Sequence, residues 1–158
     1  MAPNTKQQSP EALGLTIATR NFGTITVQPE QIITLSPGLL GFADLHRYVL
    51  IEYNQESPFL WMQSLDNPDL VFVVVDSVTI MPAYRIAPAP DVFQELAVKG
   101  IEDLKFFVIL TIPPGRPQDI TANLMGPIVI NLRNRRGKQL VIEGTAYSHK
   151  HRLLPEQK

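Results

Sequence analysis

The chain has 158 residues, of which 44% are hydrophobic and 18% charged, and it contains no cysteine. At this length a folded chain removes roughly 68–70% of its unfolded surface from water, so one domain with a full hydrophobic core is expected. The lack of cysteine excludes a disulfide framework, a zinc site built on cysteines and a thiol nucleophile. The net charge is −1, but residues 1–130 carry −6 (13 acids, 7 bases) and residues 131–158 carry +5 (2 acids, 7 bases).

Neither a leader nor a membrane span is expected. The first ten residues are polar, so no secretory signal is predicted and a cytoplasmic location is expected. The longest apolar run, residues 70–75, is far shorter than the ~20 residues that cross a bilayer. We expect a flexible N-terminal segment at 1–14, a single domain at 15–146 and a basic C-terminal tail at 147–158 that the pattern leaves disordered.

Alternation of apolar and polar residues with a period of two predicts strands along most of the chain. Residues 15–20 and 22–27 form the first predicted pair, joined at Asn21 in a tight hairpin. Further strands are predicted at residues 31–35, 47–53, 59–64, 70–76, 104–112, 120–124, 128–132 and 138–142. Turns rich in Pro and Gly separate nearly all of them. The pattern predicts an all-β, mainly antiparallel, small β-barrel-like single domain.

Two strands and one short helix have a defined place in this prediction. Residues 70–75 and 106–110 lack polar alternation, so both faces of these strands should be covered and the strands should be central. A helix is predicted at 92–98, with Asp91 as its N-cap, Gln94 at the capping-box position and Gly100 as its C-terminal stop. Its apolar stripe should cover an open end or a side of the sheet assembly.

Motifs of common catalytic sites do not occur. The sequence has no G-x-S-x-G, no G-x-x-x-x-G-K-[ST] and no H-E-x-x-H. His149 and His151 could supply half of a metal site at most, and a solvated tail is the favoured interpretation of both. No catalytic residue, cofactor or metal is expected.

The segment Asp66-Asn67-Pro68-Asp69 places two carboxylates close together. In a hydrolase such a pair could divide into an acid and a base. Asp and Asn next to Pro are also typical of tight turns, and this interpretation is favoured. A recognition role on an exposed loop is compatible with it.

The strongest charge run extends from Arg133 to Lys138, with four bases at a predicted hairpin tip. Such a cluster could neutralise phosphates of a nucleic acid. A solvated turn is favoured, because the rest of the chain is acidic and the aromatic residues lie in apolar strands instead of among the bases. An acidic protein partner at this hairpin remains open.

The loop from Ser36 to Phe42 combines Pro and Gly residues with three large apolar side chains, Leu39, Leu40 and Phe42. Two interpretations are open. The apolar side chains either pack under the sheet or form an exposed contact patch.

Several segments of the chain resemble the flagellar assembly factor family, FliW, in the order in which that family has them. They are TLSPGLLGF (34–42), SPFLWMQSLDNPDL (57–70), FVVVD (72–76) and TANLMGPIVINL (121–132), which leads into RRGKQ (135–139). The resemblance runs from about residue 16 to residue 154. It departs at Leu35, Ala43 and Gly126, where the family often has Phe, an acidic residue and Ala.

The resemblance implies a small β-barrel-like protein without catalytic activity that binds two alternative protein partners. One is flagellin, and the other is CsrA, an RNA-binding repressor of flagellin translation. When flagellin is exported, the freed protein would bind CsrA and relieve repression. No direct contact with nucleic acid or membrane is expected. The residues expected to bind a partner are Leu39, Leu40, Phe42, Asp66, Asn67, Asp69, Arg135 and Arg136.

Two other classes of function remain as alternatives. A small β-barrel nucleic-acid-binding protein would use the hairpin from Arg133 to Lys138, and its RNA affinity would fall steeply with salt. An enzyme or ligand-binding barrel would use Asp66 and Asp69, and would need a deep pocket with an inward carboxylate.

Overall fold

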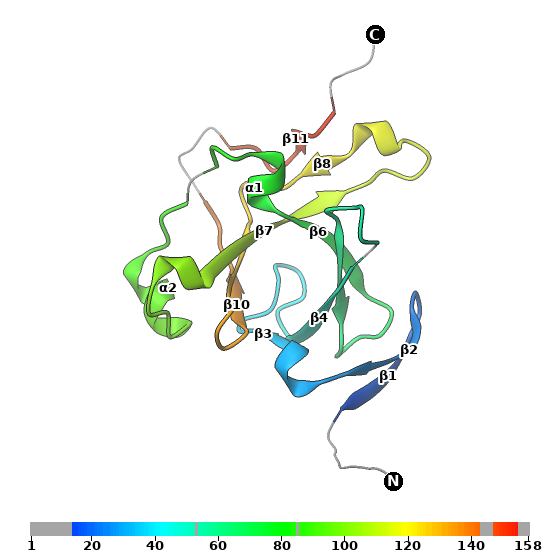
Figure 1. Cartoon of the computed structure of the whole chain (residues 1–158). Helices are drawn as coiled ribbons and strands as arrows, with labels where there is room; N and C mark the ends of the chain where they lie inside the picture. Colours follow the sequence, from blue (N-terminus) through cyan, green and yellow to red (C-terminus); the bar gives the residue numbers. More distant parts are fainter. Residues whose placement is uncertain (1–13, 53, 85, 143–146, 155–158) are drawn as a thin grey trace.

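The computed structural model describes residues 14–52, 54–84, 86–142 and 147–154 (Figure 1). The expected N-terminal segment, apart from Gly14, lies outside these residues. The strands are β1 Leu15–Thr19, β2 Gly23–Val27, β3 Ile33–Leu35, β4 Arg47–Glu52, β5 Leu60–Ser64, β6 Val71–Asp76, β7 Leu104–Thr111, β8 Thr121–Ala122, β9 Ile128–Asn131, β10 Arg136–Gln139 and β11 His151–Arg152. The helices are α1 Ser77–Ile80 and α2 Pro90–Glu95, and the 3₁₀ turns are η1 Pro29–Gln31, η2 Ile101–Asp103 and η3 Pro117–Asp119.

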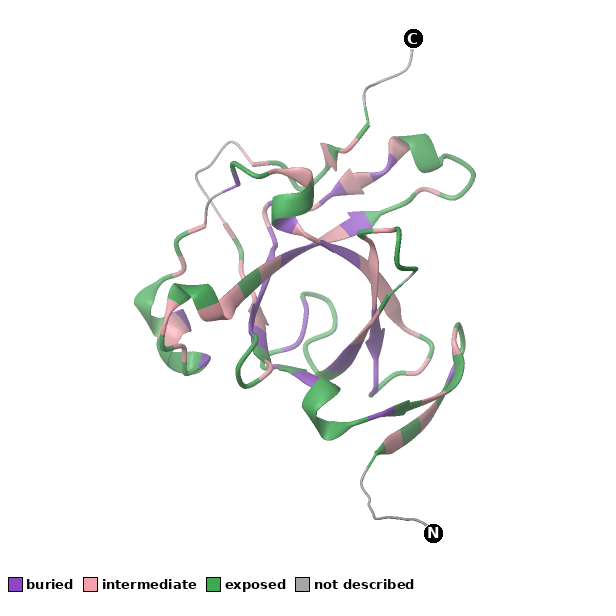
Figure 2. Ribbon diagram, viewed as in Figure 1, coloured by how far each residue is buried: buried purple, intermediate pink, exposed green. Residues whose placement is uncertain are grey.

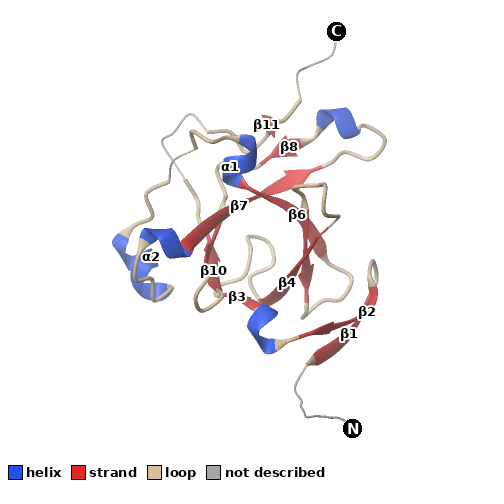
Figure 3. Cartoon of the chain, viewed as in Figure 1, coloured by secondary structure: helices blue, strands red, loops and turns tan. Residues whose placement is uncertain are grey.

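A closed barrel of seven strands forms the centre of the molecule, as Figures 1 and 3 show. Its strand order is β7-β6-β5-β4-β3-β10-β9, and β9 pairs back onto β7 from Phe107↔Ile128 to Leu104↔Asn131. Neighbouring strands are antiparallel except β3 and β10, which run parallel. Closure removes free sheet edges from these strands. The predicted all-β, mainly antiparallel barrel is confirmed, and β6 and β7 are central as expected.

The inward side chains of the barrel strands fill its interior, because successive residues of a strand point to opposite faces. Figure 2 shows the buried segments around the inside of the ring. The main core cluster consists of Ile33, Leu35, Leu39, Tyr48, Met62, Val74, Phe107, Ile128 and Ile130, all at most 3% exposed. Leu39 comes from the loop after β3 and not from a strand. This loop turns into the ring of strands (Figure 1) and supplies part of the core.

Strands β1 and β2 form a separate two-stranded sheet, paired from Leu15↔Val27 to Thr19↔Gly23, and each is one residue shorter at the turn than predicted. Gly23 has a φ of 65°, which suits a residue without a side chain at the end of this tight connection. The sheet packs against the barrel through a second cluster that includes Val27, Val49 and Leu65. The predicted hairpin is confirmed.

Strands β8 and β11 extend the sheet beyond β7 and cover a third apolar cluster. The backbone N–H of Leu124 donates to the carbonyl of Ser148 over 2.9 Å, and the Tyr147 ring contacts the Tyr84 ring with centroids 4.6 Å apart. Residues 147–154 therefore pack on the sheet, and the expectation of disorder is wrong for this part of the tail. A strand of two residues is too short to produce a periodic signal in the sequence.

Two predicted strands have clearly different bounds in the structure. Strand β8 stops at Ala122, because the side chain of Asn123 accepts the N–H groups of Met125 and Gly126 and makes a turn. Strand β10 begins at Arg136, two residues earlier than predicted, because Arg136 and Gly137 pair with both β9 and β3. The pairing with β3 joins residues far apart in the sequence.

The predicted helix exists as α2, but both of its predicted ends are wrong. Its N-cap is Ala89 without a side-chain bond, and Asp91 lies in the first turn, because Pro90 fixes the φ of the first helical residue. The helix ends at Glu95 with Leu96 as its C-cap, and Ala97 with a φ of 53° takes the left-handed place expected of Gly100. Its apolar residues cover the outside of β9, as the cluster with Val129 shows. Helix α1, capped by Asp76, was not predicted.

Candidate functional site

The Asp66 side chain holds two backbone segments together. Its Oδ2 accepts hydrogen bonds from the N–H groups of His46 (2.9 Å) and Arg47 (3.0 Å), and its Oδ1 accepts one from Arg47 Nε (2.8 Å). Burial raises the pKa of Asp66, but these hydrogen bonds and the charge of Arg47 outweigh burial and hold the pKa below its usual value. The main task of Asp66 is therefore structural: it fixes the end of the 36–46 loop at the start of β4.

Asn67 and Asp69 form the turn between β5 and β6. The Asn67 N–H donates to Ser64 Oγ (2.9 Å), and Asn67 Oδ1 accepts the Asp69 N–H (3.1 Å). The favoured turn interpretation is confirmed for these residues. The Asp69 carboxylate forms no ion pair with another described residue and lies on the exposed surface of the turn. It is free for a partner.

The loop from Ser36 to Phe42 behaves in both of the ways that the sequence left open. Leu39 is 1% exposed and belongs to the barrel core, whereas Leu40 is 66% exposed. Phe42 lies between these extremes, with an edge-to-face contact to Phe72 at 5.4 Å between ring centroids. The Leu40 N–H donates to Gln139 Oε1 (2.8 Å), which ties the loop to the end of β10. Leu40 and part of Phe42 therefore form a fixed apolar surface.

A glycine in this loop is required by close packing. A Cβ on Gly38 would collide with the carbonyl oxygens of Phe42 and Leu45. Because these are backbone atoms on the same loop, they cannot move aside like the end of a flexible side chain. The loop shape that exposes Leu40 therefore depends on Gly38.

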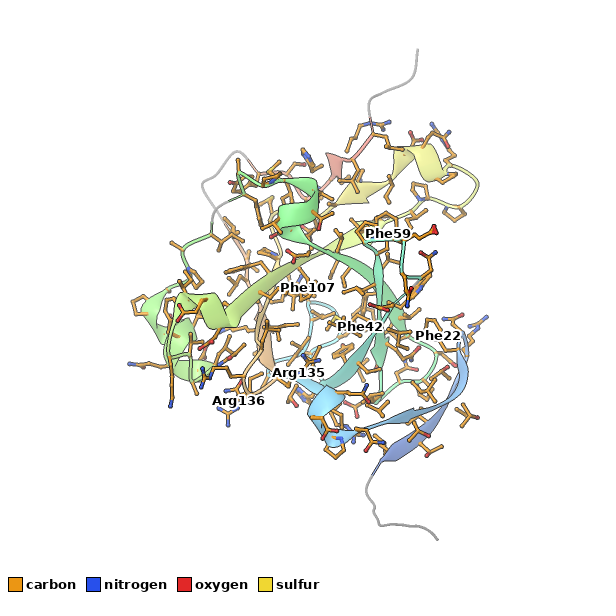
Figure 4. The ribbon with its side chains drawn as sticks, viewed as in Figure 1. Phe22, Phe42, Phe59, Phe107, Arg135 and Arg136 are labelled. Carbon is orange, nitrogen blue, oxygen red and sulfur yellow. The ribbon has the colours of Figure 1, made fainter. Side chains whose placement is uncertain are left out.

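The bases of the 133–138 run occupy different environments at the β9–β10 hairpin. Lys138 pairs with Glu95 of α2 at 2.8 Å, and Arg133 lies 3.7 Å from Asp103 while 65% exposed. Arg135 has a φ of 63°, and its Nη2 makes a long hydrogen bond of 3.4 Å to the carbonyl of Gln31. Arg136 is exposed and forms no ion pair among the described residues. Arg135 and Arg136 diverge from the hairpin, as Figure 4 shows.

Two shallow hollows flank this hairpin and share Thr34 and Asn134. One has a volume of about 490 Å³ and is lined by Thr34, Ser36, Glu95, Asn134, Arg136 and Gly137, among others. The other has a volume of about 520 Å³, and Glu30, Ile32, Thr34, Leu132, Arg133 and Arg135 contribute to its walls. The sequence analysis missed Thr34 and Glu95 here. Pairing of β3 with β10 and docking of α2 bring them to the hairpin, and neither contact leaves a local pattern in the sequence.

The sequence analysis also missed an aromatic hollow beside the β1–β2 hairpin. Phe22 and Trp61 meet edge to face with ring centroids 5.8 Å apart, and the hollow of about 510 Å³ is also lined by Asn21, Ile51 and Glu52. Phe22 and Phe42 point from different parts of the fold in Figure 4, so this hollow is separate from the loop surface.

The residues expected to bind partners thus fall into two groups. Asp66 bonds to His46 at the end of the 36–46 loop, which places the turn of Asp66, Asn67 and Asp69 next to that loop. Arg135 and Arg136 belong to the β9–β10 hairpin on the other side of β3. His149 lies in an exposed turn and His151 in β11. Within the described ranges no three His, Cys, Asp or Glu side chains gather as metal ligands would.

None of the helices described here is long and apolar enough to cross a membrane.

Comparison with known proteins identifies the family. The family model described as FliW protein matches residues 16–153. The flagellar assembly factor FliW of Thermoanaerobacter pseudethanolicus is 39% identical over 143 residues, which cover 90% of this chain and 95% of that protein. The FliW proteins of Treponema denticola and Geobacillus kaustophilus are 38% and 37% identical over 141 residues each, covering 89% of this chain and 94% and 96% of those proteins.

A solved structure has the same fold. The crystal structure of a flagellar assembly factor FliW superimposes with a TM-score of 0.83 at 36% identity, and the match covers 90% of this chain and 99% of that one. The matched region includes the whole barrel and the hairpin with Arg135 and Arg136. The chain belongs to the FliW family of flagellar assembly factors.

Proposed function

We propose that this flagellar assembly factor is a non-enzymatic cytoplasmic regulator that binds flagellin and, alternatively, the RNA-binding repressor CsrA. Binding to CsrA relieves repression of flagellin translation, and flagellin withdraws the protein from CsrA. The observation that carries this proposal is the FliW match over residues 16–153, which extends through every strand of the barrel.

The distribution of burial supports a role for the outer surface. The barrel interior holds apolar side chains such as Tyr48, Met62 and Phe107, all at most 3% exposed. Leu40 and the Asp69 carboxylate, in contrast, stand on neighbouring exposed segments held in place by Gln139 and by Asp66. A fixed apolar side chain and a free carboxylate on neighbouring segments suit a partner with a basic, partly apolar surface.

Electrostatics supply a way to weaken RNA binding without occupying the RNA site. Residues 1–130 carry a net charge of −6. Docked beside the RNA site of CsrA, this charge opposes phosphates that lie within a Debye length, about 8 Å at physiological salt. A coupling of about 1–3 kcal/mol would weaken RNA binding roughly 5- to 150-fold.

Size-exclusion chromatography with purified components tests the proposal. CsrA mixed with this protein should elute as a stoichiometric complex, and added flagellin should move the protein out of it. Absence of a complex with either partner at micromolar concentrations contradicts the proposed function.

A matched pair of variants tests the surface. Asp69→Lys should weaken the CsrA complex, whereas Glu56→Lys, in the turn at the opposite end of β5, should not. Equal effects of the two variants would show that general charge, and not the Asp69 turn, controls binding. Asp66 is unsuitable for this test, because its charge reversal removes the hydrogen bonds to His46 and Arg47.

A further inference from the structure

The β9–β10 hairpin holds an arginine in a conformation that disfavours it. Arg135 has a φ of 63°, a region in which Gly or Asn is far more common than a long side chain. The hairpin enforces this conformation, because the Arg135 N–H donates to Asn131 (2.8 Å) and its carbonyl accepts from the Thr34 N–H (3.0 Å). A strained residue kept at the surface points to a function of its side chain.

The hydrogen-bonding capacity of the Arg135 guanidinium is largely unused. Its Nε is buried and has no hydrogen-bond partner in the described structure, and the hydrogen bond from its Nη2 to the Gln31 carbonyl is long at 3.4 Å. A guanidinium offers five N–H donors in a planar fork that suits a carboxylate. The side chain therefore contributes little to the fold through hydrogen bonds, and its terminal nitrogens retain donors for another molecule.

Neighbouring bases differ in how far they are neutralised. Glu95 forms an ion pair with Lys138 at 2.8 Å, so the charge of Lys138 is already neutralised. Arg133 is 65% exposed with only a 3.7 Å contact to Asp103, and the Arg136 side chain forms no ion pair with another described residue. Arg133, Arg135 and Arg136 together form a surface of available positive charge, which we call the arginine tip.

Apolar side chains stand beside the arginine tip. Leu132 is 44% exposed, lines the same hollow as Arg133 and Arg135, and also lines a second hollow with Val78, which is 57% exposed. Ile101, 60% exposed, lies in η2 next to Glu102 of that second hollow. The arginine tip therefore has one exposed apolar residue of the hairpin, Leu132, beside its charges, and further exposed apolar residues on the neighbouring α1 and η2.

We propose that the arginine tip, with Leu132, is a docking site for an acidic segment of a protein partner in which carboxylates flank a large apolar side chain. Carboxylates would meet Arg133, Arg135 and Arg136, and the apolar side chain would contact Leu132. A nucleic acid fits this face less well. The described walls of the two hollows that flank the hairpin contain no aromatic ring on which a base could stack. This site goes beyond the proposed function, since it depends on neither CsrA nor flagellin.

Amide chemical-shift mapping by NMR on the full chain tests the site directly. The probe is a synthetic peptide with the core Glu-Leu-Glu-Glu-Leu-Glu, and the control peptide has Gln in place of each Glu. The acidic peptide should shift the amides of Leu132, Arg133, Arg135 and Arg136, and the Gln peptide should not. Shifts located elsewhere, or none at millimolar peptide, overturn the proposal.

Variants separate binding from folding. Arg135→Gly removes the side chain and relieves the backbone conformation, so it should weaken peptide binding while leaving the melting temperature unchanged or higher. Arg133→Gln and Arg136→Gln should each weaken binding about two- to fivefold, as expected for exposed charge pairs. Arg116→Gln, an equally exposed arginine beyond the other end of β7, should have no effect. Equal losses for Arg116→Gln and Arg136→Gln contradict a specific site.

A single-stranded RNA of about 12 nucleotides provides the remaining comparison. The proposal predicts that the RNA binds more weakly than the acidic peptide. Stronger RNA binding at the same amides, falling steeply with salt, would replace the proposal with a nucleic-acid site.

Discussion

The side-chain amide of Asn131 donates a hydrogen bond to the backbone carbonyl of Leu96 over 2.9 Å, and so joins the end of α2 to the last residue of β9. Asn134 Nδ2 donates to the same carbonyl over 2.9 Å, and Asn131 Oδ1 accepts the N–H of Arg133 over 2.9 Å. One asparagine therefore positions both the helix that carries Glu95 and the hairpin that carries the arginines.

Asn131→Ala should lower the free energy of unfolding by about 1–3 kcal/mol, because Asn131 is 1% exposed and its loss leaves buried backbone groups with fewer partners. Urea denaturation measures this change. Asn134→Ala is the control: its residue is exposed and Asn131 still satisfies Leu96, so a loss under about 1 kcal/mol is expected. Equal losses would mean that burial of Asn131 is irrelevant.

Two adjacent leucines should respond in opposite ways to the same substitution. Leu39→Ala should cost about 2–5 kcal/mol, because it opens a cavity in the barrel core. Leu40→Ala should change stability by no more than about 0.5 kcal/mol, because Leu40 is 66% exposed. Thermal or urea unfolding of both variants checks this prediction, and a large loss for Leu40→Ala would show that the loop does not hold the described conformation.

Removing the hydroxyl group from each of two buried tyrosines should change the stability of the protein in opposite directions. The Tyr84 hydroxyl donates a hydrogen bond to the Leu124 carbonyl, so Tyr84→Phe should lower the free energy of unfolding by about 1–3 kcal/mol. The Tyr48 hydroxyl is buried without a partner in the described structure, and burial, with a smaller contribution from Asp66, raises the pKa of Tyr48 to about 12. Tyr48→Phe should therefore raise stability by about 1 kcal/mol. Destabilisation by Tyr48→Phe would reveal a partner for that hydroxyl.

Asp66 should make a defined contribution to acid stability. Its pKa is lower in the folded chain than the ordinary value of about 3.9. The contribution is therefore complete above the ordinary pKa and is lost as the pH falls through the lowered folded pKa. Unfolding free energies between about pH 6 and pH 2 should fall less steeply in Asp66→Asn than in the parent chain. Parallel pH curves for the two proteins would contradict this role.

Much of the barrel could be predicted from the sequence, because strand periodicity is a local property. The β1–β2 hairpin was predicted to within one residue of each strand end, and the unbroken apolar runs marked β6 and β7 as central. Periodicity could not place the ends of α2, where Pro90 and the left-handed Ala97 decide the start and the stop. It also could not separate Leu39 from Leu40, which differ only in the direction that the folded loop gives them.

The candidate surfaces were predictable only in part. Residue types singled out Asp66 and the arginines, but the structural role of Asp66 depends on the N–H groups of His46 and Arg47, which folding brings across from another segment. Similarly, neutralisation of Lys138 by Glu95 depends on the docking of α2 against the barrel. Such contacts join residues far apart in the chain and leave no spacing pattern.

A titration of RNA binding by CsrA tests most directly whether this protein antagonises CsrA. Fluorescence anisotropy would measure the affinity of CsrA for flagellin leader RNA with and without saturating amounts of this protein, and the reverse titration would measure CsrA binding with and without RNA. We expect the affinity of CsrA for RNA to weaken roughly 5- to 150-fold, and RNA to weaken the affinity of CsrA for this protein by the same factor. If the RNA affinity of CsrA does not change when its complex with this protein is fully formed, the proposed antagonism is wrong.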